Sequence, residues 1–425
     1  MVVSRATRAP LRIAVIGCGT AGAASALFLA RAGHMITLLE RVPEPGPVGA
    51  GVMIQPSGLA VLARLGCEAR IFARGARVDR LVCQNDRGVS ILSLAYESLA
   101  PGLHGIGLHR GVLFETLYAA VLAQERIELR CGVGIERVGP RGRYGRSLVD
   151  DTGKRHGPFD LVVVCDGARS RVRDSMRDVS SRVVPYPWGA LWFIADDRDD
   201  RYARVLFQKV RGTRRMAGML PTGLGPGAGT TSHVSLFHSV RADAVDAWRR
   251  GGIEAWKVHV SAFAPETQPI LDQIDHMDQL TFASYFDVTM PRWHASGVVF
   301  LGDAGHATSP QLGQGVNLAL CDAMALDDAL TLKSDASIDD ALALYTKRRR
   351  DHLAFYQWAT RWLTPFFQSD LESLGWLRDR AMGRSSLLSY VEREMVRSMC
   401  GTKTGIVLGS FPARMPANAS NGGIR

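Results

Sequence analysis

The segment Gly17-Cys18-Gly19-Thr20-Ala21-Gly22 decides the fold, because its three glycines lie between an apolar strand and an Ala-rich helix. Arg12 to Ile16 is mostly apolar and β-branched, which predicts a buried parallel strand. Ala21 to Ala32 predicts a helix that ends at Gly33, since Ala and Leu favour helices and Gly favours their C-terminal ends. Ile36 to Leu39 predicts a second strand. Together these segments predict a βαβ unit.

The glycine-rich turn has the spacing that dinucleotide-binding proteins use. Glycines at these positions allow a tight turn, let the backbone approach a pyrophosphate and let the helix pack closely on the strand. The helix N-terminus adds unpaired N–H groups and a positive dipole. Glu40 ends the second strand, where its carboxylate can accept hydrogen bonds from ribose hydroxyls and would repel a 2′-phosphate. The segment therefore predicts a site for NAD or FAD.

The composition is that of a globular protein and excludes a disordered or fibrous chain. Of 425 residues, 46% are hydrophobic and 22% charged, and the length suggests two or three domains. The net charge of +10 is best explained by a solvated basic surface, and part of it is compatible with an anionic cofactor or substrate. Because the basic residues form no stripe with aromatic residues between them, we expect no nucleic-acid partner.

The cysteines and the N-terminus bear on the cellular compartment. The seven cysteines are scattered without a C-x-x-C pair, so we expect no disulfide framework and no metal site, and we expect a cytoplasmic protein. The apolar stretch from Ile13 to Ala30 resembles a signal peptide, but three glycines interrupt it and strand character resumes afterwards. No apolar run approaches the ~20 residues that a transmembrane helix needs.

The remaining pattern predicts a split α/β domain with an insertion. Buried strands are predicted near 160–164 and 298–301, and residues 183–290 alternate in the manner of an antiparallel sheet. Loops rich in Gly and Pro are expected at 45–58 and 221–229. The predicted boundaries are an α/β domain of residues 11–182 and 291–335, a β-sheet substrate domain of residues 183–290, and a C-terminal helical region of residues 336–425.

The C-terminal region predicts helices at Asp370–Ala381 and Ser386–Met399, with a frayed tail at Ala417–Arg425. We expect these helices to cap the active site or to pack on a sheet. A partner surface and a membrane contact remain open alternatives.

Two later motifs narrow the choice of cofactor. Cys165-Asp166-Gly167 follows one buried strand, and Gly302-Asp303-Ala304-Gly305-His306 follows another and leads to Gly313-Gln314-Gly315-Val316-Asn317. With three motifs in this order over most of residues 11–350, the sequence resembles the class A flavoprotein aromatic hydroxylases, the para-hydroxybenzoate hydroxylase group. The resemblance implies an α/β fold: a Rossmann-like FAD-binding domain of the glutathione-reductase type with an inserted antiparallel β-sheet substrate domain and C-terminal helices.

The resemblance implies that FAD lies along these motifs, with Glu40 at the adenosine ribose and Asp303 at the ribitol. Arg110 would contact the pyrophosphate or the ribitol, and Asp166 would serve both FAD and the pyridine nucleotide, or cap the turn after it. The helix N-terminus near Gly315 suits negative charge on a reduced flavin. The residues expected to bind cofactor are Gly17, Gly19, Thr20, Ala21, Gly22, Glu40, Arg41, Arg110, Asp166, Gly302, Asp303, Pro310, Gly313, Gly315, Val316 and Asn317.

One position departs from the family pattern. The family has Gly-Asp-Ala-Ala-His where this chain has Gly305 as the fourth residue. We expect this glycine to add local backbone freedom without affecting FAD binding.

The resemblance also implies the reaction. NADPH or NADH reduces FAD, O2 adds at flavin C4a, and the hydroperoxide hydroxylates an electron-rich ring, while the protein supplies orientation and a dry pocket. Pro310 lies beside the flavin ring in this family, and His233 is a candidate general base, as are His238 and Tyr186. A planar aromatic substrate would suit the aromatic residues of the inserted sheet. These are Tyr186, Trp188, Trp192, Phe207 and Phe237.

Several alternatives remain at this point. Arg204, Arg214 and Arg215 could receive a substrate carboxylate or be solvated surface residues. Epoxidation and decarboxylative hydroxylation use the same machinery. A flavin halogenase is disfavoured because the W-x-W-x-I-P motif is absent, Trp188 and Trp192 being four residues apart. A non-catalytic flavoprotein that binds a partner is a further alternative, and either a monomer or a homodimer is expected.

Overall fold

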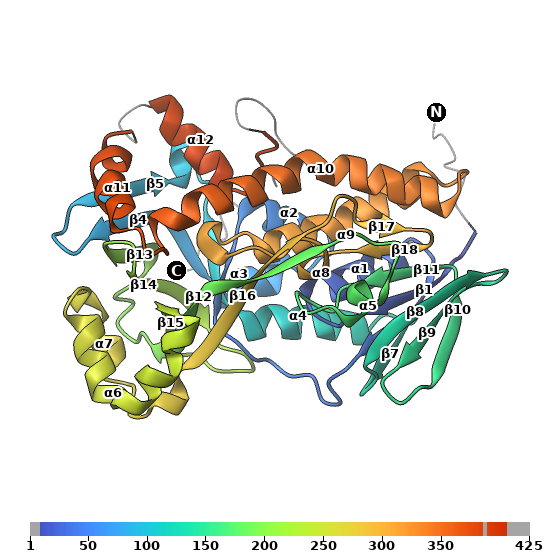
Figure 1. Cartoon of the computed structure of the whole chain (residues 1–425), viewed down its shortest axis with the longest axis horizontal. Coiled ribbons are helices and arrows are strands. Elements are labelled where there is room, and N and C mark those ends of the chain that lie inside the picture. Colours follow the sequence, from blue (N-terminus) through green and yellow to red (C-terminus); the bar gives the residue numbers. More distant parts are fainter. Residues whose placement is uncertain (1–8, 386–388, 406–425) are drawn as a thin grey trace, which may run out of the picture.

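A six-stranded sheet carries the first glycine-rich turn (Figure 1). The computed structural model describes residues 9–385 and 389–405. The strands of this sheet are parallel except for the first in the spatial order, which is antiparallel to its neighbour. The order is β17 (His294–Ala295), β18 (Val298–Phe300), β11 (Leu161–Val164), β1 (Arg12–Ile16), β2 (Met35–Glu40) and β7 (Ile127–Cys131).

Helices rich in small residues pack around this sheet. Helix α1 is buried along nearly its whole length because its Ala residues let neighbouring helices approach closely. It contacts α4 and α9, and α9 in turn contacts α2 and α10. The five helices are α1 (Thr20–Arg31), α2 (Pro56–Arg64), α4 (Arg110–Leu122), α9 (Gly315–Leu332) and α10 (Ile338–Leu363). The predicted α/β fold class with its Rossmann-like domain is confirmed.

The second large sheet has nine strands and includes the predicted antiparallel strands of residues 183–290. Its path is β16 (Thr281–Thr289), β12 (Arg182–Asp196), β15 (Ser232–Arg241), β14 (Arg215–Leu224), β13 (Arg204–Arg211), β4 (Ala76–Asn85), β6 (Gly105–His109) and β3 (Gly51–Ile54), with β5 (Ser90–Ala95) paired to β4. Hereafter it is called the large sheet.

The large sheet is not confined to the residues predicted for it. Strand β13 pairs in parallel with β4, so that backbone groups at the β13 edge are satisfied by a segment far earlier in the chain. The loop predicted over 45–58 is also wrong in part, since it contains β3 and the start of α2. The Gly51 N–H donates to Ser235 Oγ at 3.0 Å, which holds β3 against the sheet. The domain boundaries themselves stay a prediction.

The smaller elements complete the architecture. A three-stranded antiparallel sheet lies at the opposite end of the molecule from the C-terminal helices (Figure 1). It consists of β8 (Ile135–Gly142), β9 (Gly145–Asp150) and β10 (Arg155–Phe159). The remaining helices are α3 (Glu68–Arg74), α5 (Arg171–Ser175), α6 (Val245–Ser261), α7 (Gln268–Leu271), α8 (Asp303–His306), α11 (Glu372–Ser385) and α12 (Ser389–Met399).

One face of the large sheet packs against α6 and α7. Leu236 on β15 belongs to an apolar core with Trp256 and Phe263 of this helical layer. Since side chains alternate along a strand, the neighbouring Phe237 points to the opposite face. The same alternation directs His238 toward α6, where Trp256 Nε1 donates to His238 Nδ1 at 3.1 Å. One face of the large sheet is therefore buried in an apolar core, and its other face is available to form a site.

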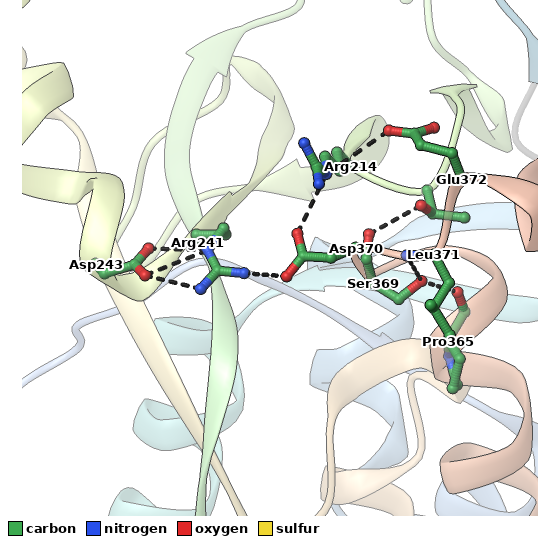
Figure 2. A network of polar contacts seen from close by, with 9 residues as sticks. Arg214, Arg241, Asp243, Pro365, Ser369, Asp370, Leu371 and Glu372 are labelled. Carbon is green, nitrogen blue, oxygen red and sulfur yellow. Dashed lines mark hydrogen bonds and ion pairs between the residues drawn. The ribbon is translucent and has the colours of Figure 1, made fainter.

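The C-terminal helices lie over β4, β5 and β13 (Figure 1), and ion pairs join them to the large sheet (Figure 2). Asp370 accepts from Arg241 of β15 and lies 3.2 Å from Arg214 Nε, which also lies 3.6 Å from Glu372. Thr213 Oγ1 donates to the Ser369 carbonyl at 2.8 Å. These contacts hold the segment between α10 and α11 against the sheet.

The predicted bounds of these helices agree approximately with those in the structure. Helix α11 corresponds to the predicted 370–381 segment, and α12 to part of 386–399. Residues 386–388 and the predicted tail at 417–425 lie outside the described residues. Within those described, no helix is long and apolar enough to span a membrane.

The buried His238 predicts a pH-dependent stability. Burial, together with the charges of His259 and Arg215, lowers the pKa of His238 to about 3. The unfolded chain, with a His pKa near ~6.5, then binds a proton between about pH 3 and pH 6.5 that the folded chain does not, so stability falls with acidification by about 1.4 kcal/mol per pH unit. His238→Gln, which keeps an acceptor for Trp256, should flatten this dependence in urea unfolding curves measured from pH 7 to pH 5. An unchanged slope would contradict the assignment.

Candidate active site

The first glycine-rich turn has the shape of a cradle for a phosphate group. A Cβ atom on Gly22 would lie 1.8 Å from the Gly17 carbonyl oxygen, and one on Gly17, where φ is +95°, would lie 2.5 Å from the Cys165 oxygen. These two positions therefore need glycine for close packing of helix and strand. A Cβ on Gly19 would meet nothing within 4 Å, and Gly19 lines a cavity. The turn thus leaves open space where the backbone N–H groups of α1 begin at Thr20.

Glu40 is held rigidly at the edge of this cavity. Its Oε2 accepts from the Cys18 N–H at 2.7 Å and its Oε1 from the Val42 N–H at 2.9 Å. Each carboxylate oxygen retains a second lone pair for another donor. The side chain is therefore fixed in place while it still offers acceptor capacity to a ribose diol, which fits the predicted role.

Two cations line the cavity near the glycine-rich turn. Arg110 begins α4, next to Gly49, and Arg41 follows β2. Neither guanidinium group forms an ion pair with any residue in the described part of the chain. Uncompensated cations beside a helix N-terminus favour phosphate binding. The arrangement fits a pyrophosphate at this end of the cavity.

The Gly-Asp motif is positioned by a buried carboxylate. Asp322 of α9 accepts from the Gly302 N–H at 2.8 Å, lies 2.6 Å from His306 Nε2, and accepts from Arg349 Nε at 2.6 Å. Burial alone would raise the pKa of Asp322, but the charges and hydrogen bonds of His306 and Arg349 hold it well below its usual range. His306 therefore fixes the loop. Asp303, by contrast, is exposed to the cavity and has no hydrogen-bond partner among residues 9–385 and 389–405.

Close packing explains why Gly305, the position that departs from the family pattern, has no side chain. It does not have a positive φ, and a Cβ there would lie 3.0 Å from Trp293 Cδ1 and 3.2 Å from the Phe300 oxygen. The expected gain in backbone freedom is therefore not its role. A side chain at this position would push against the buried indole of Trp293.

The start of α9 forms the other wall of the cavity. Pro310 begins a short 3-10 turn that ends at Gly313, which has φ +61°, and Gly315 begins the helix. A Cβ on Gly315 would meet nothing within 4 Å, and Pro310, Gly313, Gly315 and Val316 line the cavity. Open space in front of a helix N-terminus fits a ring that carries negative charge.

Asn317 does not line the cavity but ties its walls together. Its Oδ1 accepts from the Gln55 N–H at 2.8 Å, and its Nδ2 donates to the Met53 carbonyl at 3.0 Å. The side chain thus holds the end of β3 against α9. It supports the site without contacting what occupies it.

Asp166 follows β11 and lines the same cavity. Its Oδ1 is buried and has no hydrogen-bond partner among the residues that the structure describes. Burial raises the pKa of Asp166, although a hydrogen bond from Ser170 opposes the shift. A buried, unsatisfied carboxylate oxygen is costly unless a ligand supplies a donor. The expected cap of the following turn accounts for one carboxylate oxygen of Asp166, and its Oδ1 is available to a bound group.

The three motifs border one cavity of about 1030 Å³, which Gly19, Glu40, Asp166, Asp303 and Gly315 all line. It runs from the glycine-rich turn to the second face of the large sheet, where Trp192 and Phe237 form an aromatic wall with ring centroids 5.2 Å apart. Trp192 Nε1 donates to Tyr285 OH at 3.3 Å, and burial raises the pKa of Tyr285 to about 12. Three sequence motifs and two of the predicted aromatic residues are therefore brought together.

Other predicted residues lie outside the cavity. Phe207 packs with the α6 core because it points to the opposite face of β13 from its cavity-lining neighbours Leu206 and Gln208. Trp188 lies beyond the cavity, where the Arg241 guanidinium is 5.9 Å from its ring. Tyr186 lies in an irregular stretch of β12 and is also absent from the lining.

The predicted general base also lies away from the cavity. His233 is near the start of β15, with Nδ1 3.3 Å from the Gly223 carbonyl and Nε2 3.6 Å from Asp196. It does not line the cavity, and His238 faces α6. Gly22 is likewise outside the lining, because it packs α1 on β1.

Much of the cavity wall was not predicted. Tyr285 was missed although the aromatic content of β16 was visible, and the apolar residues of β4, β5 and the C-terminal helices carry no motif. Among them are Leu81, Leu92, Leu94, Phe355, Trp358, Trp362, Phe367, Met395 and Met399. No group of His, Cys, Asp or Glu side chains suited to a metal ion occurs among the described residues.

Comparisons with known proteins agree with this geometry. The FAD-binding-domain family model matches residues 11–129 and 149–356. The 3-hydroxybenzoate 6-hydroxylase of Klebsiella oxytoca is 25% identical over 368 residues, which cover 83% of this chain and 87% of that protein. The kynurenine 3-monooxygenase of Xanthomonas campestris is 27% identical over 427 residues, which cover 94% and 86%.

Solved structures share the fold. A variant of HpxO from Klebsiella pneumoniae, complexed with FAD, has a TM-score of 0.76 at 18% identity and covers 91% of this chain and 99% of its own. A 2-methyl-3-hydroxypyridine-5-carboxylic acid oxygenase has a TM-score of 0.72 at 20% identity, with 92% and 97% covered. The order of motifs, the cavity and the matched length lead to one conclusion: the chain belongs to the FAD-binding-domain family, as a class A flavoprotein monooxygenase.

Proposed function

We propose that this FAD-dependent monooxygenase uses NADPH or NADH and O2 to hydroxylate an aromatic or other electron-rich small molecule, bound against Trp192 and Phe237. The observation that carries the proposal is the continuity of the cavity, which joins the dinucleotide motifs to that aromatic wall. The named relatives act on 3-hydroxybenzoate and kynurenine. Epoxidation and decarboxylative hydroxylation would use the same arrangement of residues and remain the alternatives.

The residues divide the work of holding the cofactor. Bound FAD would accept a hydride from the nicotinamide and activate oxygen, which is chemistry that no side chain supplies. The N–H groups at the start of α1, together with Arg110 and Arg41, would bind the pyrophosphate. Glu40 would bind the adenosine ribose and Asp303 the ribitol. The N-terminus of α9, with Pro310 beside it, would stabilise negative charge on the ring.

Tyr285 is the side chain that we propose orients the substrate. Its oxygen already accepts a hydrogen bond from Trp192 Nε1, so its own O–H proton can be donated into the cavity. With its pKa raised to about 12, it stays protonated at neutral pH. A neutral donor of this kind can fix a substrate oxygen and share the proton as charge develops there.

The cellular setting and the assembly remain proposals. The seven cysteines are all free, which supports the reducing cytoplasm that we infer. A monomer or homodimer is still our expectation, although one protein of similar fold occurs in a tetrameric form.

The test of the proposed function is a panel of phenols, quinones and heteroaromatics incubated with the purified yellow protein. We expect at least one compound to accelerate NAD(P)H consumption and to gain one oxygen atom by mass spectrometry. Equal NAD(P)H consumption with every compound, and no oxygenated product, would argue against a hydroxylase.

Asp303→Ala should weaken FAD binding by about tenfold, because a charge-assisted hydrogen bond to the ribitol is lost. Flavin fluorescence during titration of FAD into apoprotein measures the change. Asp199→Ala, which removes an exposed carboxylate in a turn that does not line the cavity, is the matched control and should bind FAD normally. An Asp303→Ala variant that binds FAD as tightly as the control would remove Asp303 from the site.

Tyr285→Phe should lower kcat/KM roughly tenfold for the substrate found in the panel, since it removes one hydrogen-bond donor and keeps the ring. FAD content should not change. Steady-state kinetics with unchanged kcat/KM would show that Tyr285 serves only to pack against Trp192.

A further inference from the structure

The cavity continues beyond the aromatic wall into a compartment between the large sheet and the C-terminal helices. Its sheet side is lined by apolar side chains such as Leu92, Leu94 and Leu206. Its helix side is lined by Phe355 and Trp362 of α10 and by Met395 of α12. The compartment therefore offers two opposed apolar surfaces, which a planar hydrocarbon framework can contact on both faces.

In the part of the chain that the structure describes, the walls of the compartment carry a single cation, and that cation is already paired. Among the described lining residues of the large sheet and of the chain from α10 onward, Lys403 is the single cation. Its buried Nζ lies 2.5 Å from Glu394 Oε2, and Arg397 lies 2.5 Å from the other oxygen of that carboxylate. A carboxylate placed here would be buried without a partner, which is strongly unfavourable.

The arginines considered as carboxylate receivers are used elsewhere. Arg204 Nε donates to Asp79 at 2.5 Å, and Arg214 pairs with Asp370 and Glu372 outside the cavity (Figure 2). Arg215 does not line the cavity. None of these three arginines is therefore placed to bind an aromatic acid in this compartment. Arg169, which lines the cavity outside the compartment, donates to Ser284 Oγ of β16 at 3.2 Å.

The compartment reaches the surface between α10 and α12. Trp358, Trp362 and Tyr390 all line the cavity although 45%, 54% and 60% of their surface is exposed. The rings of Trp358 and Trp362 are nearly parallel, with an interplanar angle of 14° and centroids 6.2 Å apart. A flat molecule can therefore enter past aromatic faces without desolvating charged groups.

From these observations we propose that the compartment binds a large, uncharged aromatic substrate of two or more rings, or one ring with a long apolar substituent, which enters between α10 and α12. The proposal rests on the proposed hydroxylase function and names its substrate class. A small aromatic acid would fill only part of the compartment and would leave its charge unpaired.

The first test measures binding to the purified holoenzyme by isothermal titration calorimetry at pH 7.5, with three probes. 2-Naphthol should bind roughly tenfold more tightly than phenol because it buries a second ring. It should bind about 100-fold more tightly than 6-hydroxy-2-naphthoate, which has the same rings and a carboxylate. Equal or tighter binding of the naphthoate, or no binding of 2-naphthol, would overturn the proposal.

The second test fills the compartment from α10. Ala359→Phe adds a ring where Ala359 lines the cavity, and should weaken 2-naphthol binding about tenfold while phenol binding changes less than ~2-fold. Ala119→Phe adds the same ring on the exposed surface of α4 and should leave both affinities unchanged. Flavin content and thermal melting report on folding. A folded Ala359→Phe variant that binds 2-naphthol as tightly as the control would show that 2-naphthol does not bind in this compartment.

The binding and turnover measurements test the substrate class and the hydroxylase function separately. If 2-naphthol is preferred but no compound is oxygenated, the substrate class stands and the hydroxylase proposal fails. If the naphthoate is both preferred and oxygenated, the hydroxylase stands and the substrate class proposed here is wrong.

Discussion

The buried carboxylate of Asp322 is the contact on which the site depends. It binds the Gly302 N–H, His306 and Arg349 at once, so α9, α10 and the Gly-Asp loop share one fixed charge. Arg349 also forms a hydrogen bond with His352 Nδ1. The other ring nitrogen of His352, Nε2, lies 2.9 Å from the Gly401 carbonyl just after α12. Since removing one partner would leave the others buried and uncompensated, the Gly-Asp loop and the end of α12 are held in one arrangement.

At the substrate end of the cavity, the alternation of side chains along the strands decides which residues face the site. On β15, Leu236 joins the α6 core while Phe237 lines the cavity, and on β13 Phe207 and Gln208 divide in the same way. One sheet therefore supplies stability on one face and an aromatic wall on the other. The C-terminal helices lie across the compartment from this face of the sheet, and their apolar residues form its second wall.

Most of the residues predicted to bind the cofactor line the cavity, whereas only two of the five predicted substrate residues do; their roles in binding stay predictions. Gly17 and Gly22 are needed for contacts within a few residues or between neighbouring strands, so their spacing carries the information. The aromatic residues of β12, β13 and β15 were recognised as a group, but register decides which of them face the cavity. The sequence pattern shows alternation without showing which face is buried against α6.

By itself the sequence determined the βαβ unit and the order of three motifs, because each depends on local spacing of glycines and carboxylates. The choice of FAD and the reaction class came from the resemblance that this order of motifs carries. Only the tertiary structure decided that β3, β4 and β6 complete the large sheet, and that Phe355, Trp362 and Met395 line the same cavity as its aromatic wall. Such contacts join residues far apart in the chain. They depend on edge pairing and on packing of apolar surfaces, which no short pattern records.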